Sequence, residues 1–143
     1  MVIHFICRGN THRSRLAEAY AKSLTQHANG IRVLSSGIEA DRDLNGPIMP
    51  FVKLVLENEG LLHLTGATWT QTTQSLIDES DVIVFMSGDV HDEAATRFRT
   101  PPARSHTWHI PDVQGVEGRI REAVGRFVSQ LELVRPRREG LRS

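Results

Sequence analysis

Apolar and polar positions along the chain alternate in blocks that predict strands and helices in turn. Short apolar runs bounded by turn residues predict strands, and these are Val2–Ile6, Ile31–Ser35, Val82–Met86 and Ser105–Trp108. Between them, apolar residues recur at the spacing of one helix face. The predicted helices are Arg13–His27, a second from Pro47 or Pro50 to Gly60, Gln74–Glu79, Asp89–Phe98, and a last one from Val116 or Glu117 to Leu133.

This order of elements predicts an α/β fold. Strands that alternate with helices form a parallel sheet with right-handed crossovers, so we expect three layers, a four-stranded parallel sheet with helices on both faces. Ligands of such sheets bind beyond the carboxyl ends of the strands. The loops that follow Ile6, Ser35, Met86 and Trp108 are therefore expected to meet at one edge.

The first predicted strand runs directly into a loop with distinctive chemistry. The only cysteine of the sequence stands there, and an arginine follows after five intervening residues, where the helical pattern starts. A cysteine and an arginine at this spacing on a strand-to-helix turn favour a phosphate-binding loop with a nucleophile at its base. We call residues 7–14 the cradle; they are Cys7, Arg8, Gly9, Asn10, Thr11, His12, Arg13 and Ser14.

Several physical features of the cradle favour an anion site. Its backbone N–H groups can point inward, and the following helix adds its positive N-terminal end. Arg13 can bind two phosphoryl oxygens with its planar guanidinium, and in that field Cys7 is expected to be a thiolate nucleophile. The structural alternatives are Cys7 as a small buried core residue and Arg13 as an ordinary first-turn side chain. They leave Gly9, Asn10 and Ser14 unexplained.

The cradle resembles the opening of the low-molecular-weight protein tyrosine phosphatases and their arsenate reductase relatives. That family begins with a short strand followed by a Cys-x5-Arg-Ser loop. Weaker similarities continue in the family's order along nearly the whole chain. They lie at Leu34–Gly37, Gly60, Ser80–Met86 and Trp108–Asp112. The resemblance implies a flavodoxin-like fold of the low-molecular-weight phosphatase type.

The resemblance also implies a mechanism and a role for each residue. Such an enzyme is a metal-independent phosphatase that passes through a cysteinyl-phosphate and uses no cofactor. Residues 8–13 would bind the phosphate, Ser14 would stabilise the Cys7 thiolate, and Asn10 and Ser35 would hold the cradle in shape. Asp112, in the acid loop (residues 109–115), would be the general acid and base. An ordinary loop or capping role remains the alternative for Asp112, and Asp89 and Asp92 are its nearest replacements.

The sequence departs from the family pattern at several positions. Val113 stands where the family has proline, and no aromatic residue follows it, although phosphotyrosine-specific members carry one there. Arg15 replaces a proline, which predicts a wider or more polar site. These changes leave a phosphorylated protein or a small phosphoester as the substrate. His12 replaces a frequent second cysteine, and we expect a solvent-exposed histidine, with substrate steering or tuning of Cys7 as alternatives.

Composition narrows the remaining possibilities. Lys plus Arg and Asp plus Glu are both 17, so the zero net charge gives no support for nucleic-acid binding. With 39% hydrophobic residues and no long apolar run, a membrane partner is not expected. The single cysteine excludes an internal disulfide and a cysteine-rich zinc site, and favours a cytoplasmic location. His4, His106 and His109 give no convincing metal site.

We further expect one phosphatase-like domain over residues 1–134, a basic tail over residues 135–143, and a monomer or weak dimer. Other function classes stay open. A sugar-transport-type phosphocarrier also uses a cysteine at the end of a first strand, but it needs neither Arg13 nor Asp112. A phosphate-binding regulatory module with weak catalysis is compatible with the altered acid loop. The arsenate reductase branch uses additional cysteines, so this chain would need an external thiol for that chemistry.

Overall fold

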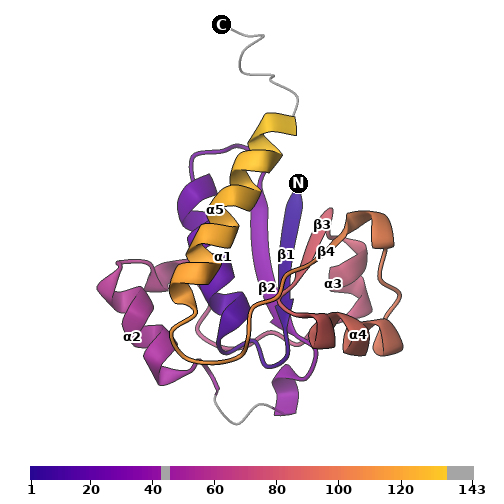
Figure 1. Ribbon diagram of the computed structural model, residues 1–143, viewed down its shortest axis with the longest axis horizontal. Coiled ribbons are helices and arrows are strands. Elements are labelled where there is room, and N and C mark those ends of the chain that lie inside the picture. The colour runs from indigo at the N-terminus through magenta and orange to yellow at the C-terminus, as the bar shows by residue number, and fades with distance from the viewer. Residues whose placement is uncertain (43–45, 135–143) are drawn as a thin grey trace, which may run out of the picture.

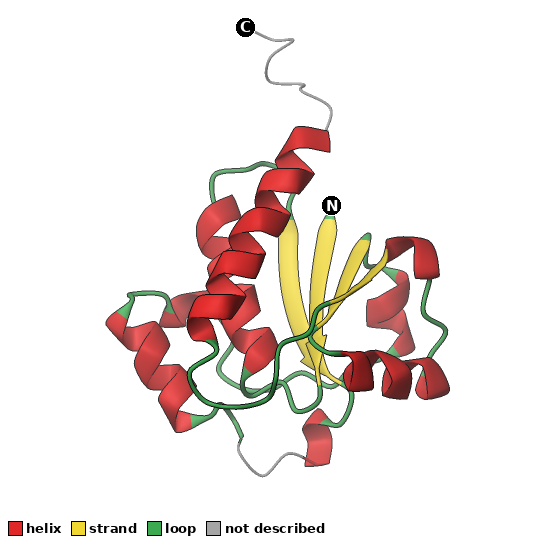
Figure 2. Ribbon diagram, viewed as in Figure 1, coloured by secondary structure: helices red, strands yellow, loops and turns green. Residues whose placement is uncertain are grey.

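The fold is a parallel four-stranded sheet between two layers of helices, as predicted (Figures 1 and 2). The computed structural model describes residues 1–42 and 46–134. The strand order is β2-β1-β3-β4, and every neighbouring pair is parallel. The strands are β1 (Val2–Cys7), β2 (Arg32–Gly37), β3 (Val82–Phe85) and β4 (Ser105–Thr107). Their carboxyl ends point the same way, toward the bottom of Figure 2, where the connecting loops gather.

The helices divide between the two faces of the sheet. They are α1 (Arg13–Thr25), α2 (Pro50–Asn58), α3 (Gln74–Asp78), α4 (Gly88–Arg97) and α5 (Glu117–Val134). In Figure 1, α1, α2 and α5 lie on one side of the sheet, and α3 and α4 lie on the other. Short 3₁₀ turns occupy Ala40–Arg42, Leu62–Leu64 and Pro102–Arg104.

Strand alternation explains the two cores. Side chains of a strand point to opposite faces in turn, so Ile3 and Phe5 of β1 join the core under α1 and α5. Ile6, from the same strand, joins the core beneath α3 and α4. β1 therefore places apolar side chains on both faces of the sheet, as its run of apolar residues predicts.

One polar side chain lies fully buried in the central strand. His4 hydrogen-bonds through Nε2 to Ser36 Oγ at 2.6 Å and through Nδ1 to Ser80 Oγ at 3.1 Å. Burial removes the water that would solvate an imidazolium, and this lowers the pKa of His4 to about 3. His4 is thus a neutral residue of the core.

Several element ends differ from the predicted ones. β1 runs on to Cys7 and β2 to Gly37, because those two residues pair with each other across the sheet. α1 ends at Thr25, two residues before the predicted His27. The basic tail predicted for residues 135–143 lies outside the described residues. None of the helices in the described part of the chain is long and apolar enough to cross a membrane.

Candidate active site

The cradle wraps the carboxyl end of β1 in a tight backbone curve. Asn10 has φ 54°, a left-handed conformation that asparagine tolerates better than most residues. The curve brings the Asn10 N–H to 3.2 Å from Cys7 Sγ. It also presses against the end of β2, where a Cβ on Gly37 would lie 2.7 Å from both the Arg8 carbonyl oxygen and the Asn10 nitrogen. Glycine at position 37 is therefore a requirement of the cradle.

Hydrogen bonds converge on the sulfur of Cys7. Ser14 Oγ lies 2.9 Å from Cys7 Sγ and accepts a hydrogen bond from Asn10 Nδ2 at 2.8 Å. Toward a Cys7 thiolate the Ser14 hydroxyl is the donor, because a thiolate has no proton and can only accept. Asn10 Nδ2 also donates to Ser35 Oγ at 3.0 Å, and the Ser35 hydroxyl donates to Glu18 at 2.9 Å. The chain of polar side chains reaches from the sulfur to α1.

Arg13 is buried and held in one orientation. Its Nη1 donates to Ser87 Oγ at 2.9 Å and to the Ile110 carbonyl at 2.8 Å. Its Nε lies 3.7 Å from Asp112 Oδ1. Arg13 is therefore no ordinary surface residue of a first helical turn, since its donors point across the carboxyl edge of the sheet.

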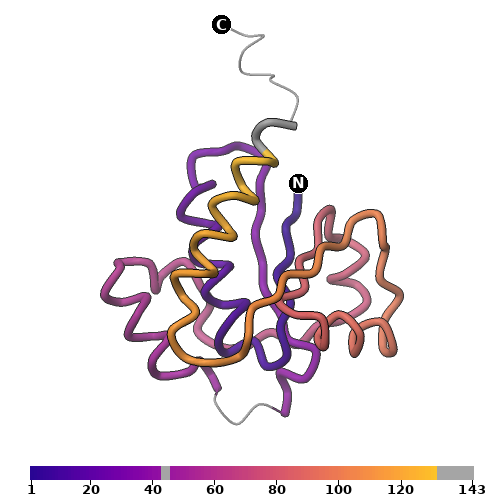
Figure 3. Tube along the Cα trace, in the orientation of Figure 1, coloured from indigo at the N-terminus to yellow at the C-terminus, as the bar shows by residue number. Residues whose placement is uncertain are grey.

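Asp112 reaches the cradle from a segment far along the chain. After β4 the acid loop crosses the lower end of the sheet toward α5 (Figure 3). Asp112 Oδ1 lies 2.9 Å from His12 Nδ1. The pKa of the Asp112 carboxyl lies below its usual value, first because His12 hydrogen-bonds to it and further because Arg13 is positive, while burial acts in the opposite direction.

The expectation of a solvent-exposed His12 is wrong. The residue is only 4% exposed, and its ring packs edge-on against Phe51 with 4.8 Å between ring centroids. The segment before α2 covers it, because the Met49 N–H donates to the Thr11 carbonyl at 3.0 Å. His12 is therefore an inner wall of the site.

A small pocket joins these groups. It has a volume of about 30 Å³ and is lined by Cys7, Gly9, Thr11, His12, Arg13, Met49 and Asp112. This space holds a group of only a few atoms. Met49 was missed by the sequence analysis, since nothing in its local pattern points to a site. Across residues 1–42 and 46–134, no group of three or more His, Cys, Asp or Glu side chains is placed to hold a metal ion.

Comparison with known proteins gives the family. A family model described as low molecular weight phosphotyrosine protein phosphatase matches residues 2–122. The chain belongs to this family. Among curated relatives, arsenate reductase 1 of Bacillus cereus is 32% identical over 129 residues, covering 86% of this chain and 87% of the relative. The resemblance of the cradle to low-molecular-weight phosphatases is thereby confirmed.

Solved structures agree on the low-molecular-weight phosphatase fold. The YwlE arginine phosphatase, in a mutant with a phosphorylated active-site serine, superimposes with a TM-score of 0.82 at 24% identity, covering 94% of this chain and 98% of that one. A low molecular weight protein tyrosine phosphatase from Bacillus subtilis gives 0.79 at 23% identity, covering 95% and 100%. At these identities the similarity establishes the fold alone.

Arg15 departs from the low-molecular-weight phosphatase pattern and lies behind the cradle. It is 1% exposed and donates to Thr65 Oγ1 at 2.6 Å, to the Pro47 carbonyl at 2.9 Å, to the Asn10 carbonyl at 3.1 Å and to the Gly66 carbonyl. Burial lowers the pKa of Arg15, and the negative charges of Glu18 and Cys7 oppose that shift. Arg15 ties three loops together and does not line the pocket as a wider site would require.

Replacing Arg15 with methionine is expected to lower the free energy of unfolding by about 3 kcal/mol. The loss has this size because several buried oxygens would lose their donor. Urea unfolding measures it. The control is Arg126→Met, at an arginine of α5 whose side chain is 72% exposed, where we expect less than about 0.5 kcal/mol. Equal stabilities of the two variants would contradict the tethering role of Arg15.

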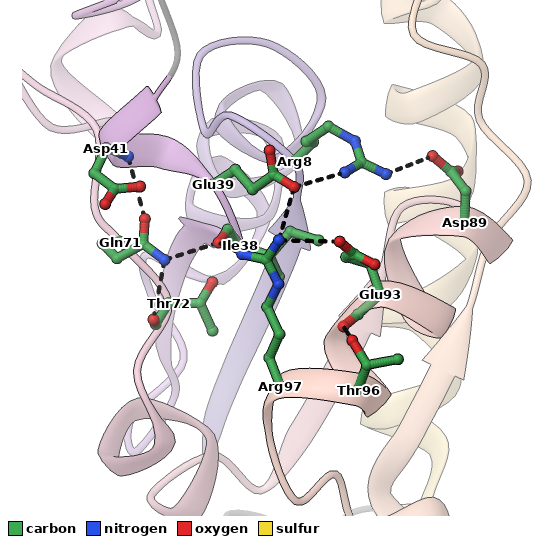
Figure 4. Close-up of polar contacts among 10 residues, drawn as sticks. All are labelled: Arg8, Ile38, Glu39, Asp41, Gln71, Thr72, Asp89, Glu93, Thr96 and Arg97. Carbon is green, nitrogen blue, oxygen red and sulfur yellow. Dashed lines mark hydrogen bonds and ion pairs between the residues drawn. The ribbon is translucent and has the colours of Figure 1, made fainter.

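Arg8 faces the rim of the cradle. Its guanidinium contacts Glu39 and Asp89 at 3.1 Å each, and Glu39 also contacts Arg97 at 3.0 Å (Figure 4). The side chain of Arg8 thus points away from the pocket, so any phosphate contact of this residue falls to its backbone N–H. Arg97 further pairs with Glu93 at 3.0 Å, and the network ties α4 to the segment that follows β2.

Proposed function

We propose that the chain is a cysteine-dependent phosphomonoester hydrolase of the protein tyrosine phosphatase type. The observation that carries this proposal is the convergence of Cys7, Arg13 and Asp112 on one pocket. A nucleophile, a bidentate cation and a carboxyl group are the parts that phosphoryl transfer through a cysteine needs. The family membership supports it, and a phosphorylated protein or a small phosphoester is the substrate.

The first step transfers the phosphoryl group to sulfur. The Cys7 thiolate attacks phosphorus in line with the leaving oxygen, so an S–P bond forms as the P–O bond breaks. Arg13 and the cradle's N–H groups offset the charge on the phosphoryl oxygens. Asp112, in its carboxylic acid form, gives its proton to the leaving oxygen. The products are the alcohol, a cysteinyl-phosphate and the Asp112 carboxylate.

The second step releases phosphate. The Asp112 carboxylate takes a proton from water, whose oxygen attacks phosphorus while the S–P bond breaks. The Cys7 thiolate leaves with a hydrogen bond from Ser14, and Asp112 is again a carboxylic acid. Asn10 and Ser35 keep Ser14 in place for both steps.

The low pKa of Asp112 has to rise before this residue can act as an acid. In the present geometry His12 and Arg13 both favour its ionised form. A phosphoryl dianion in the cradle adds negative charge beside the carboxylate and offsets the positive charge of Arg13. Both changes raise the pKa of the carboxyl. Substrate binding thereby supplies the acid form that the first step consumes.

The wild-type protein is expected to hydrolyse para-nitrophenyl phosphate at a rate that a chelator leaves unchanged. Arg13 and the backbone donors provide the positive charge that other phosphatases take from metal ions. Vanadate is expected to inhibit, because it mimics five-coordinate phosphorus. Steady-state kinetics with EDTA and with vanadate test both points. Activity that disappears with EDTA and returns with a divalent cation would refute the proposal.

Arsenate reduction is the second candidate, because a curated relative at 32% identity is named arsenate reductase. The sequence holds one cysteine, so electrons from a second thiol within the chain are not available. Arsenite would then form only in the presence of an added thiol. Parallel assays of arsenite release and aryl phosphate turnover, with and without that thiol, separate the two activities.

The two non-hydrolytic alternatives predict other outcomes. A phosphocarrier would accumulate a stable phosphoenzyme without turnover, and a regulatory module would bind phosphate without a chemical step. The buried placement of Arg13 and its ion pair with Asp112 favour hydrolysis over both. A burst experiment with para-nitrophenyl phosphate in excess over the protein distinguishes them, since a carrier releases one equivalent of nitrophenol and then stops, a regulatory module releases none, and a hydrolase continues.

A further inference from the structure

We propose that His12 is a positioning residue for Asp112, holding the carboxyl group of the acid loop at the mouth of the cradle through Nδ1–H. This role deepens the proposed hydrolase function and rests on it. His12 makes the contact from the last cradle position before the arginine, 100 positions away from Asp112 in sequence. The pair brings two distant parts of the sequence together at one point of the pocket.

The two partners differ in how firmly they are held. The His12 ring is buried and packed against Phe51. The Asp112 side chain is 59% exposed, on a loop without regular secondary structure. A carboxylate accepts hydrogen bonds and donates none, so the hydrogen must lie on His12 Nδ1. The rigid partner is therefore the donor, and it fixes the position of the exposed one.

Packing alone does not account for a histidine at this position. Its Nε2 is buried and, among the residues that the structure describes, has no hydrogen-bond partner. Burying an unpartnered polar nitrogen is unfavourable, and leucine would fill much of the space without that penalty. What histidine adds is the Nδ1–H that Asp112 accepts.

Asp112 needs the contact with His12 because its other partner, Arg13, also has to bind the substrate. Asp112 Oδ1 lies 3.7 Å from Arg13 Nε, the group that has to bind the phosphoryl oxygens of a substrate. A substrate in the cradle therefore competes with Asp112 for Arg13. When the substrate displaces Asp112 from Arg13, the hydrogen bond to His12 keeps the carboxyl group within reach of the leaving oxygen.

A matched pair of variants tests this role. Asparagine places an amide N–H close to the position of His12 Nδ1, whereas leucine has the same branching and no donor. His12→Leu is expected to lower kcat for phenyl phosphate by about 30-fold, part of the ~10²–10⁴-fold that a positioned acid supplies. The effect on para-nitrophenyl phosphate is expected to be much smaller, since its leaving group needs less help. His12→Asn is expected to recover most of the loss, and inhibition by inorganic phosphate should change less than about twofold.

Combination with Asp112→Asn isolates the coupling. If His12 acts through Asp112, His12→Leu causes no further loss in the Asp112→Asn background. Losses that multiply in the double variant would overturn the proposal. So would an equal loss for both leaving groups.

The pH dependence of kcat tests the role of His12 separately from any effect of its packing. The charged and titratable groups around the Asp112 carboxyl are His12, Arg13 and Cys7 on the cradle side and Asp89 from α4. Loss of the His12 donor raises the pKa of Asp112, so the basic limb of kcat for phenyl phosphate is expected to move to higher pH in His12→Leu. In His12→Asn it should stay close to wild type. An unmoved limb in His12→Leu would count against the proposal.

Two controls keep the outcome interpretable. His12→Gln retains an amide but places its N–H near the Nε2 position, so this variant is expected to behave like His12→Leu. If His12→Leu does not fold, His12→Gln takes its place in the comparison. A wild-type protein without turnover would refute the hydrolase function itself, and a protein that stays active as Cys7→Ser would refute its dependence on the cysteine. An active wild type with multiplicative His12 and Asp112 losses would refute only the role of His12.

Discussion

Replacing Cys7 with serine is expected to abolish phosphatase turnover while phosphate binding remains. The hydroxyl fits the same place beside Ser14 Oγ and the Asn10 N–H, so the cradle keeps its shape. It is, however, far less ionised than a thiol in the same field. Loss of a nucleophile of this kind costs on the order of 10⁵-fold or more in kcat. Steady-state kinetics and calorimetric titration with inorganic phosphate measure the two halves of the result.

Cys7→Ala serves as the matched control, because it removes any nucleophile from position 7. Cys7→Ser and Cys7→Ala should be equally inactive toward para-nitrophenyl phosphate, and both should still bind phosphate. Turnover by both variants near the wild-type rate would place the nucleophile elsewhere in the chain. Turnover by the serine variant alone would show that a hydroxyl suffices, and the thiolate mechanism would be wrong.

Replacing Asp112 with asparagine is expected to lower kcat for phenyl phosphate by about 10²–10⁴-fold, the usual contribution of a positioned acid. For para-nitrophenyl phosphate the loss should be much smaller, because an activated leaving group departs without a proton. The basic limb of the pH profile should also weaken, since it reports deprotonation of the acid. Initial rates across a series of aryl phosphates measure the dependence.

Asp92→Asn is the control for that series. Asp92 lies on α4 with a side chain that is 83% exposed, away from the pocket, and its replacement should leave the leaving-group dependence unchanged. A uniform loss in Asp112→Asn across all leaving groups would remove Asp112 from the acid role. Asp89 would then be the next candidate, although it is engaged with Ser87 and Arg8.

The fold followed from sequence because its signals are local. Short apolar runs such as Val82–Phe85 and amphipathic segments such as Arg13–Thr25 need no knowledge of distant partners to be recognised. The cradle was equally predictable, since Cys7 and Arg13 stand within one loop. The catalytic roles given to these residues and to Asp112 stay predictions, whereas their convergence on one pocket is now a structural observation.

The misjudged positions depend on contacts that the sequence does not carry. His12 follows a polar loop and gives no sign of burial, yet Phe51 of α2 and the segment before that helix cover it. Arg15 sits one residue beyond the cradle, and its acceptors come from Pro47, Thr65 and Gly66. Such burial is decided by how distant loops close over the carboxyl edge of the sheet. The spacing of apolar residues within α1 gives no sign of this burial.

The neutral His4 in β1 also limits the stability of the folded protein at acid pH. An unfolded chain takes up a proton at His4 near pH 6.5, whereas the pKa of His4 in the folded chain is about 3. Between those values the unfolded state binds more protons than the native one, so acidification favours unfolding. Each pH unit removes up to about 1.4 kcal/mol of folding stability by this linkage. Loss of activity in acid can therefore originate in the sheet, far from the thiol and carboxyl groups of the cradle.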